Sequence, residues 1–177
     1  MAGHSHWKQI KEHKGAADKK RGAVFSKLLK AISVASKTDP KPEFNPRLRS
    51  AIEKAKEFNV PQENIERAIK KASSNEEVLE DLIIEAYGPN GIAMIIKAVT
   101  TSKNKTIQEI KAILKEKNAK WAETGNVCWA FEQNEKNLEW QPKFRQTLSA
   151  DQKKELENLV FALEDHEDVE KVYANAD

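Results

Sequence analysis

The spacing of apolar residues changes once along this chain, and that change constrains the fold more than any other feature. Between residues 24 and 72, apolar side chains recur every three or four positions, the period of an amphipathic helix. From residue 82 onward, short apolar runs and alternating segments dominate, and these are typical of strands. The sequence therefore predicts a helical domain over residues 1–72 and a compact α+β domain over residues 78–177, and so an α+β fold class.

Three helices are predicted in the first domain. The first has a buried stripe and ends at Thr38–Pro42, because proline cannot continue a helix. Its other side is expected to form a basic outer face that includes Lys20, Lys27, Lys30 and Lys37. Asn45 followed by Pro46 is typical of a helix N-cap, and a third helix follows Val60-Pro61. Matching apolar stripes predict a three-helix bundle; these stripes comprise Val24, Phe25, Leu28, Leu29, Ile32, Ala35, Leu48, Ala51, Ile52, Ala55, Phe58, Ile65, Ala68, Ile69 and Ala72.

The second domain is predicted to be a small, mostly antiparallel sheet with helices on one face. Residues 82–87 and 92–100 form a hairpin around the turn Gly88–Gly91. Thr106 with Glu109 is interpreted as a capping box, as is Ser149 with Gln152. Further strands are expected at residues 127–131 and 169–174, whereas Pro142 limits residues 138–140 to an edge or an extended loop.

The net charge of +2 conceals a strong asymmetry between the two halves. Residues 1–72 carry 17 Lys and Arg against 8 Asp and Glu, a net charge of +9, and residues 73–177 carry 13 against 20, a net charge of −7. Such asymmetry favours a polyanion as partner of the basic half. The acidic half is expected to face a protein partner or to point away from the polyanion.

A basic arm and first helix are therefore the candidate nucleic-acid-binding site. Lysine acts on phosphate as a point charge, and an exposed tryptophan stacks on an unpaired base. A solvated charged face is the alternative interpretation. Because lysine outnumbers arginine and the sequence shows no helix-turn-helix spacing, zinc finger or RNP signature, recognition of backbone and shape is favoured. The candidate residues are His4, His6, Trp7, Lys8, Lys11, His13, Lys14, Lys19, Lys20, Arg21, Lys27 and Lys30.

Other candidate sites are weaker. His4, His6 and His13 lack a carboxylate or cysteine partner at metal-ligand spacing, and Glu164–Asp168 is interpreted as a solvated acidic turn rather than a cation site. The lone Cys128 is expected in an apolar strand as a buried, inert thiol, and Trp121, Trp129 and Trp140 as core or groove residues. No catalytic constellation, metal or cofactor is predicted, so a non-enzymatic protein is expected.

Bulk composition places the protein in the cytoplasm. Charged residues make up 33% of the chain, the mean hydropathy is −0.72, and no apolar window reaches the length of a membrane span. The N-terminus contains no apolar stretch of signal-peptide length, and the single cysteine fits a reducing compartment. Membrane partners are not expected, and the oligomeric state stays open.

Several of these segments together resemble the YebC/PmpR family, which includes the mitochondrial translational activator of cytochrome oxidase. The resemblance extends over most of the chain in the right order, and its motifs are highly specific in combination. The segments that carry it are Met1–Trp7, Lys19–Gly22, Asn45–Arg49, Asn64–Lys71, Tyr87–Gly91, Glu123–Val127 and Leu163–Asn175.

The resemblance implies a helical domain and two α+β domains, one inserted within the other. It also implies a ribosome-associated translation factor that contacts large-subunit rRNA and relieves stalling at consecutive prolines. A DNA-binding transcriptional regulator is the alternative, and a protein-interaction module without nucleic acid is the second. The family's inserted domain is replaced here by a short connector between Phe131 and Leu138, and His6, Gly15 and Ala23 stand where members typically have lysine.

Overall fold

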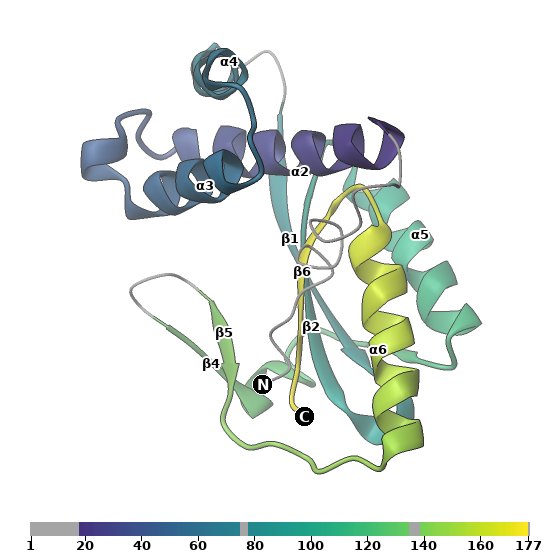
Figure 1. The fold of residues 1–177 in the computed structure, drawn as a ribbon. Coiled ribbons are helices and arrows are strands. Elements are labelled where there is room, and N and C mark those ends of the chain that lie inside the picture. Colours follow the sequence, from purple (N-terminus) through teal and green to yellow (C-terminus); the bar gives the residue numbers. More distant parts are fainter. Residues whose placement is uncertain (1–17, 75–77, 135–138, 177) are drawn as a thin grey trace.

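The computed structural model describes residues 18–74, 78–134 and 139–176, with side chains in the first segment described from Gly22 onward. Within these described ranges, three helices precede a mixed region of sheet and helix (Figure 1). The order of the elements confirms the α+β fold class that the sequence predicts. Within the described residues, no helix is long and apolar enough to cross a membrane.

The three helices are α2 (Asp18–Ser36), α3 (Pro46–Glu57) and α4 (Gln62–Ser73). Their apolar stripes meet in one core, where Ile32, Leu48 and Ile65 are almost fully buried. Helix α2 packs against both other helices, which makes it the centre of the bundle (Figure 1). The predicted helices and their buried residues are confirmed.

Asn45 fixes the junction between α2 and α3. Its side-chain oxygen accepts a hydrogen bond from the backbone N–H of Leu48 at 3.0 Å, which confirms the predicted N-cap. Its amide nitrogen donates to the carbonyls of Ala35 and Asp39, both at 2.7 Å. One buried side chain therefore closes the end of one helix and starts the next.

The main sheet has four antiparallel strands in the order β3-β1-β2-β6. These strands are β1 (Glu80–Tyr87), β2 (Ala93–Thr100), β3 (Lys120–Ala122) and β6 (Val169–Ala174). Helices α5 (Lys103–Glu116) and α6 (Ala150–Asp165) cover one face, as predicted (Figure 1). The Ser149–Gln152 capping box at the start of α6 is confirmed.

Among the described residues, a small hairpin and helix α2 pack on the other face of the sheet. A small hairpin of β4 (Phe131–Gln133) and β5 (Trp140–Pro142) is paired as a separate two-stranded sheet. Phe131 packs with Ile95 and Tyr173 on the main sheet. Near the other end of the strands, Val34 of α2 packs against Leu79 and Val99, so the helical bundle rests directly on the sheet. Arg47 of α3 adds two hydrogen bonds to the carboxylate of Asp81, at 2.8 and 3.1 Å.

Two predicted elements are wrong. Helix α5 begins at Lys103, so Thr106 lies inside the helix and does not cap it. The predicted strand over residues 127–131 is instead a short 3-10 turn (Cys128–Ala130) that leads into β4. The reason is a contact distant in sequence: the carboxylate of Glu85 accepts backbone N–H groups that a strand would have paired with a neighbouring strand. Strand β3 was not predicted.

Candidate nucleic-acid interface

The twelve residues of the candidate site fall into three groups. His4, His6, Trp7, Lys8, Lys11, His13 and Lys14 lie outside the described residues. Lys19, Lys20 and Arg21 lie in the first turn of α2, whose backbone is described. Only Lys27 and Lys30 have described side chains, and both contact the α+β region. A nucleic-acid role for the first two groups therefore stays a prediction.

Lys30 ends in a buried polar network at the junction of the two regions. Its ammonium lies 2.6 Å from Oδ1 of Asp168, whose other oxygen accepts the hydroxyl of Thr106 at 2.7 Å. Asp168 is 7% exposed, and Thr106 is completely buried. Burial opposes ionisation of Asp168, but the hydrogen bonds from Lys30 and Thr106 prevail and lower its pKa below the usual value. The network therefore holds a charged pair between α2 and β6.

The other lysines on this side of α2 also have partners within the protein. Lys27 donates to the backbone carbonyl of Glu164, and Lys37 donates to that of Leu79 at 2.7 Å. Burial lowers the pKa of Lys27 to about 8, against the opposing effect of the Asp165 and Glu164 carboxylates. The expected basic outer face is therefore wrong for Lys27 and Lys30, because this side of the helix rests on the sheet region, whereas Lys37, just after α2, is exposed as expected.

The acidic segment Glu164–Asp168 at the end of α6 is only partly solvated: Asp165 and Glu167 are exposed as predicted, whereas Glu164 and Asp168 are buried. Glu164 is 3% exposed, and its carboxylate accepts the backbone N–H of Val172 at 3.3 Å. His166 lies 2.9 Å from Glu109 and accepts the backbone N–H of Asp168 at 3.1 Å. Ligand atoms of Glu109, His166 and Asp168 come within 4.8 Å of one another. Because Lys30 and Thr106 already occupy both oxygens of Asp168, the cluster serves as a junction between α2, α5 and β6.

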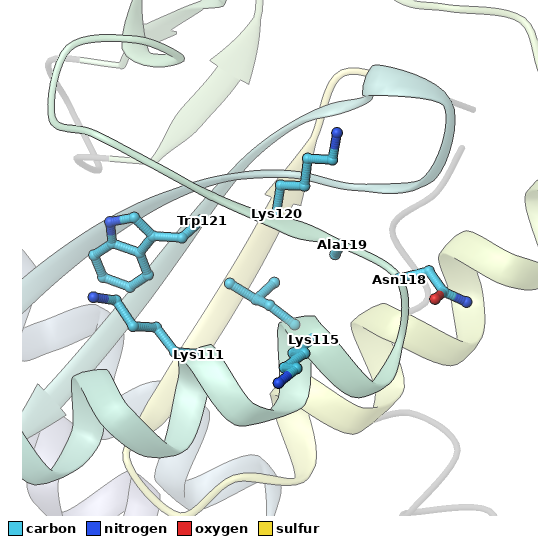
Figure 2. Close-up of a pocket in the computed structure, with 7 residues that line it drawn as sticks. Lys111, Lys115, Asn118, Ala119, Lys120 and Trp121 are labelled. Carbon is cyan, nitrogen blue, oxygen red and sulfur yellow. The ribbon is translucent and has the colours of Figure 1, made fainter.

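A second concentration of positive charge lies where the sequence analysis expected an acidic surface. An open depression of about 690 Å³ lies between α5 and the edge strand β3 (Figure 2). Lysines lie around it, and Leu114 and Ala119 supply apolar lining. Asn118 takes a left-handed conformation with φ of 56° where the chain leaves α5 and turns toward β3. We define the α5–β3 pocket by its lining residues Lys111, Leu114, Lys115, Asn118, Ala119, Lys120 and Trp121.

The lysines of this pocket differ from their neighbours on α5. Lys103 pairs with Glu80, Lys105 with Glu109 and Glu167, and Lys117 with Glu116. Lys111 instead lies 4.5 Å from the centroid of the Trp121 ring, as a cation–π contact (Figure 2). Within the described part of the chain, Lys111, Lys115 and Lys120 have no carboxylate within ion-pair distance. Among the described residues, no carboxylate therefore forms an ion pair with these three lysines.

Sequence reasoning missed this pocket because the charge was averaged over half the chain. Residues 103–121 carry six lysines and two glutamates, a net charge of +4 inside a region whose total is −7. A charge count in short windows would have found the excess. The convergence of α5 with β3 could not have been found in this way, because β3 has three residues and no detectable alternation.

Family models match nearly the whole described chain. The model of the TACO1/YebC protein N-terminal domain matches residues 5–75, and that of the TACO1/YebC second and third domain matches residues 79–136 and 133–176. This chain belongs to the TACO1/YebC family. The two matches of the second model overlap at residues 133–136, within the connector between Phe131 and Leu138 at which the missing insert is expected.

Individual relatives agree with the family assignment. A probable transcriptional regulatory protein of Trichlorobacter lovleyi is 47% identical over 135 residues, which cover 75% of this chain and 55% of that protein. One from Geobacter sulfurreducens is 41% identical over 158 residues, covering 85% and 64%. This TACO1/YebC chain thus spans about half the length of the first of these curated relatives. The crystal structure of a conserved hypothetical protein, Aq1575 from Aquifex aeolicus, superposes with a TM-score of 0.82 at 30% identity, covering 98% of this chain and 97% of that one.

One motif of the TACO1/YebC resemblance, Glu123–Val127, forms a loop around a buried carboxylate. Glu85 of β1 accepts the backbone N–H groups of Gly125 and Val127, both at 2.6 Å, and of Cys128 at 2.9 Å. Burial opposes the ionisation of Glu85, but these hydrogen bonds lower its pKa below the usual value. Burial and the nearby Glu85 raise the pKa of the Cys128 thiol to about 11, so the thiolate is disfavoured, as an inert cysteine requires.

The loop also sets the position of Trp129. This side chain was expected in a core or groove, but it is 62% exposed. Its indole N–H donates to the carbonyl of Asn126 at 2.8 Å, and its ring stacks on Phe144 with centroids 5.6 Å apart. The short 3-10 turn directs it away from the sheet, whereas a strand would have directed it inward.

Proposed function

We propose that this TACO1/YebC-family chain is a nucleic-acid-binding regulator of gene expression. The observation that carries the proposal is the family match over both halves of a chain whose N-terminal domain has a net charge of +9. Several relatives are named probable transcriptional regulatory proteins, which supports a regulatory role in general. Dense lysine provides affinity for phosphate through counterion release.

More specifically, we propose that this chain is a translation factor that contacts large-subunit rRNA and relieves ribosome stalling at consecutive prolines. The residues proposed to contact the rRNA are His4, His6, Trp7, Lys8, Lys11, His13, Lys14, Lys19, Lys20 and Arg21. Lys27 and Lys30 are omitted from this proposed interface, because their ammonium groups contact Glu164 and Asp168. Lysine-rich, backbone-directed contacts suit a folded RNA, which proteins recognise mainly by shape.

A DNA-binding transcriptional regulator is the second candidate, and one observation favours it. Four residues separate α3 from α4, a length that helix-turn-helix motifs use, although the sequence analysis saw no such spacing. The exposed face of α4 weakens this alternative, because Glu63 and Glu66 would meet the phosphates of a major groove. Arg67 on the same helix is already paired with Glu63 at 2.7 Å.

Ribosome association is the experiment that separates the two candidates. Tagged protein from a lysate is sedimented through a sucrose gradient, with and without RNase, and the same protein is titrated with promoter duplexes. The translational proposal expects RNase-sensitive migration with large subunits, and synthesis of a reporter with consecutive prolines that depends on the protein. Absence from large subunits together with tight binding to a defined promoter would establish the transcriptional alternative instead.

A further inference from the structure

The α5–β3 pocket combines three features that an unoccupied protein surface seldom brings together. It is concave, it has apolar lining at Leu114 and Ala119, and lysines without carboxylate partners lie around it. Cations without a paired carboxylate repel one another, so their electrostatic interaction with one another does not stabilise the folded protein. An anionic ligand would relieve that repulsion.

The position of the lysines indicates the size of the anion. Lys111 extends over Trp121 and Lys115 projects outward from α5, whereas Lys120 extends from the edge strand β3 on the side away from α5, so a ligand that reached all three would have to cross the edge of the sheet (Figure 2). The three ammonium groups do not converge on one point, so a single phosphate ion could not satisfy them together. Charges distributed along a rim suit a polymer with repeating phosphates.

The apolar lining and the tryptophan specify the polymer further. An acidic peptide would match the lysine charges, but its carboxylates bring no planar aromatic surface to the ring of Trp121. Sugars and bases next to phosphate present apolar and aromatic surface that can pack against the half-buried Trp121. The chemistry therefore favours a nucleic-acid strand.

We propose that the α5–β3 pocket is a second nucleic-acid contact, in which Lys111, Lys115 and Lys120 bind successive phosphates of an RNA strand. This inference rests on the proposed function, because it places another part of the same ligand on the α+β region. It assigns binding to the half of the chain that is acidic overall. Lys111 also orders Trp121, so the aromatic ring is held in place before the strand arrives.

The lysines on the rest of α5 provide a matched control for the test. The pocket variant carries Lys111→Gln, Lys115→Gln and Lys120→Gln. The control variant carries Lys103→Gln, Lys105→Gln and Lys117→Gln, the same change in net charge on the same part of the fold, at lysines that already have carboxylate partners. Dissociation constants for a labelled RNA hairpin are measured with the full chain over a series of KCl concentrations.

The pocket variant should lose about 0.7 to 0.9 in the log–log salt slope for each phosphate contact, hence about 2 to 3 in total. Its affinity near physiological salt should fall by roughly tenfold to a hundredfold. The control should keep the wild-type slope to within about one contact. Equal slopes in both variants would overturn the inference, as would an acidic peptide that binds the wild type as tightly as RNA does and is lost in the pocket variant.

Two further measurements keep the outcomes separate. Lys115→Gln with Lys120→Gln leaves the Lys111–Trp121 contact intact and should still reduce the slope by about 1.4 to 1.8, with a circular dichroism spectrum and an unfolding midpoint equal to those of the wild type. If the wild type binds neither RNA nor DNA, the proposed function fails. If the wild type binds and the pocket variants keep its affinity and slope, only this inference fails.

Discussion

Two groups of lysines in this protein behave in the opposite way to that suggested by the net charge of the region in which each group lies. Lys27, Lys30 and Lys37 belong to the half with a net charge of +9, yet each donates to a group of the α+β region. Lys111, Lys115 and Lys120 belong to the half with a net charge of −7, yet none has a carboxylate within ion-pair distance among the described residues.

The comparison teaches that the charge of a segment and the charge available to a ligand are different quantities. Because α2 packs on the sheet, Lys27 and Lys30 lie near the start of β6. There the backbone carbonyl of Glu164 accepts a hydrogen bond from Lys27, and the carboxylate of Asp168 accepts one from Lys30. Of the four lysines of α5, two pair with glutamates, and the remaining two line the α5–β3 pocket together with Lys120. We therefore expect the first group to determine stability and the second to determine binding.

The largest expected effect is at the junction. Asp168→Ala removes a buried carboxylate and leaves both Lys30 and Thr106 without their partner. The free energy of unfolding should fall by about 2 to 3 kcal/mol, somewhat less than for a fully buried ion pair because the Lys30 side chain is 29% exposed. Urea denaturation followed by circular dichroism measures the change.

Glu167→Ala is the matched control for that variant. Its side chain is 67% exposed and its ion pair with Lys105 is long, at 3.6 Å, so its removal should change stability by less than about 0.5 kcal/mol. If the two variants had the same stability, Lys30 and Asp168 would not hold the two regions together.

A smaller effect is expected inside the same network. Thr106→Val keeps the shape of a completely buried side chain but removes the hydroxyl that donates to Asp168 and lies 2.8 Å from the hydroxyl of Thr100. The loss should be about 1 to 2 kcal/mol in the free energy of unfolding. If Thr106→Val left the free energy of unfolding unchanged, Lys30 alone would stabilise the carboxylate of Asp168.

The pH dependence of stability distinguishes Lys27 from an exposed lysine. Its folded-state pKa of about 8 lies below the value of about 10.4 expected in the unfolded chain. Between these values the unfolded chain binds more protons, so Lys27 makes the protein more stable as the pH rises from about 8 to about 10. The stability of the wild type relative to Lys27→Met should therefore increase over that range, and a difference that stays flat would contradict burial of this ammonium.

The smallest effect is expected at the pocket itself. Lys111→Met removes one cation–π contact with Trp121 at a partly exposed site. This loss should lower the free energy of unfolding by at most about 1 kcal/mol. Thermal unfolding checks this value. A loss as large as that of Asp168→Ala would show that the pocket lysines serve the fold, which would remove the contrast between the two groups.

Much of the fold follows from local patterns in the sequence. The Asn45-Pro46 N-cap, the Ser149–Gln152 capping box and the buried stripe of α2 each depend on residues within a few positions of one another. The failures at Thr106 and at residues 127–131 share one cause, because a side chain distant in sequence takes over the local hydrogen bonds. Asp168 engages Thr106 across 62 positions, and Glu85 engages Val127 across 42.

Less of the candidate site could be predicted. The sequence identifies a basic domain, but not which side of α2 would be covered by the sheet. Nor does it place Lys120 beside α5, since the pairing of β3 with β1 joins residues more than thirty positions apart. The exposure of Trp129 depends on the same Glu85 contact that replaces the predicted strand.

The most direct test of the account compares two double variants that each remove two positive charges. Lys27→Gln with Lys30→Gln should lower the free energy of unfolding and leave the salt slope of RNA binding unchanged. Lys115→Gln with Lys120→Gln should leave stability unchanged and reduce the slope by about 1.4 to 1.8. The reverse result, with the slope lost only in the α2 variant, would contradict the assignment of the two groups.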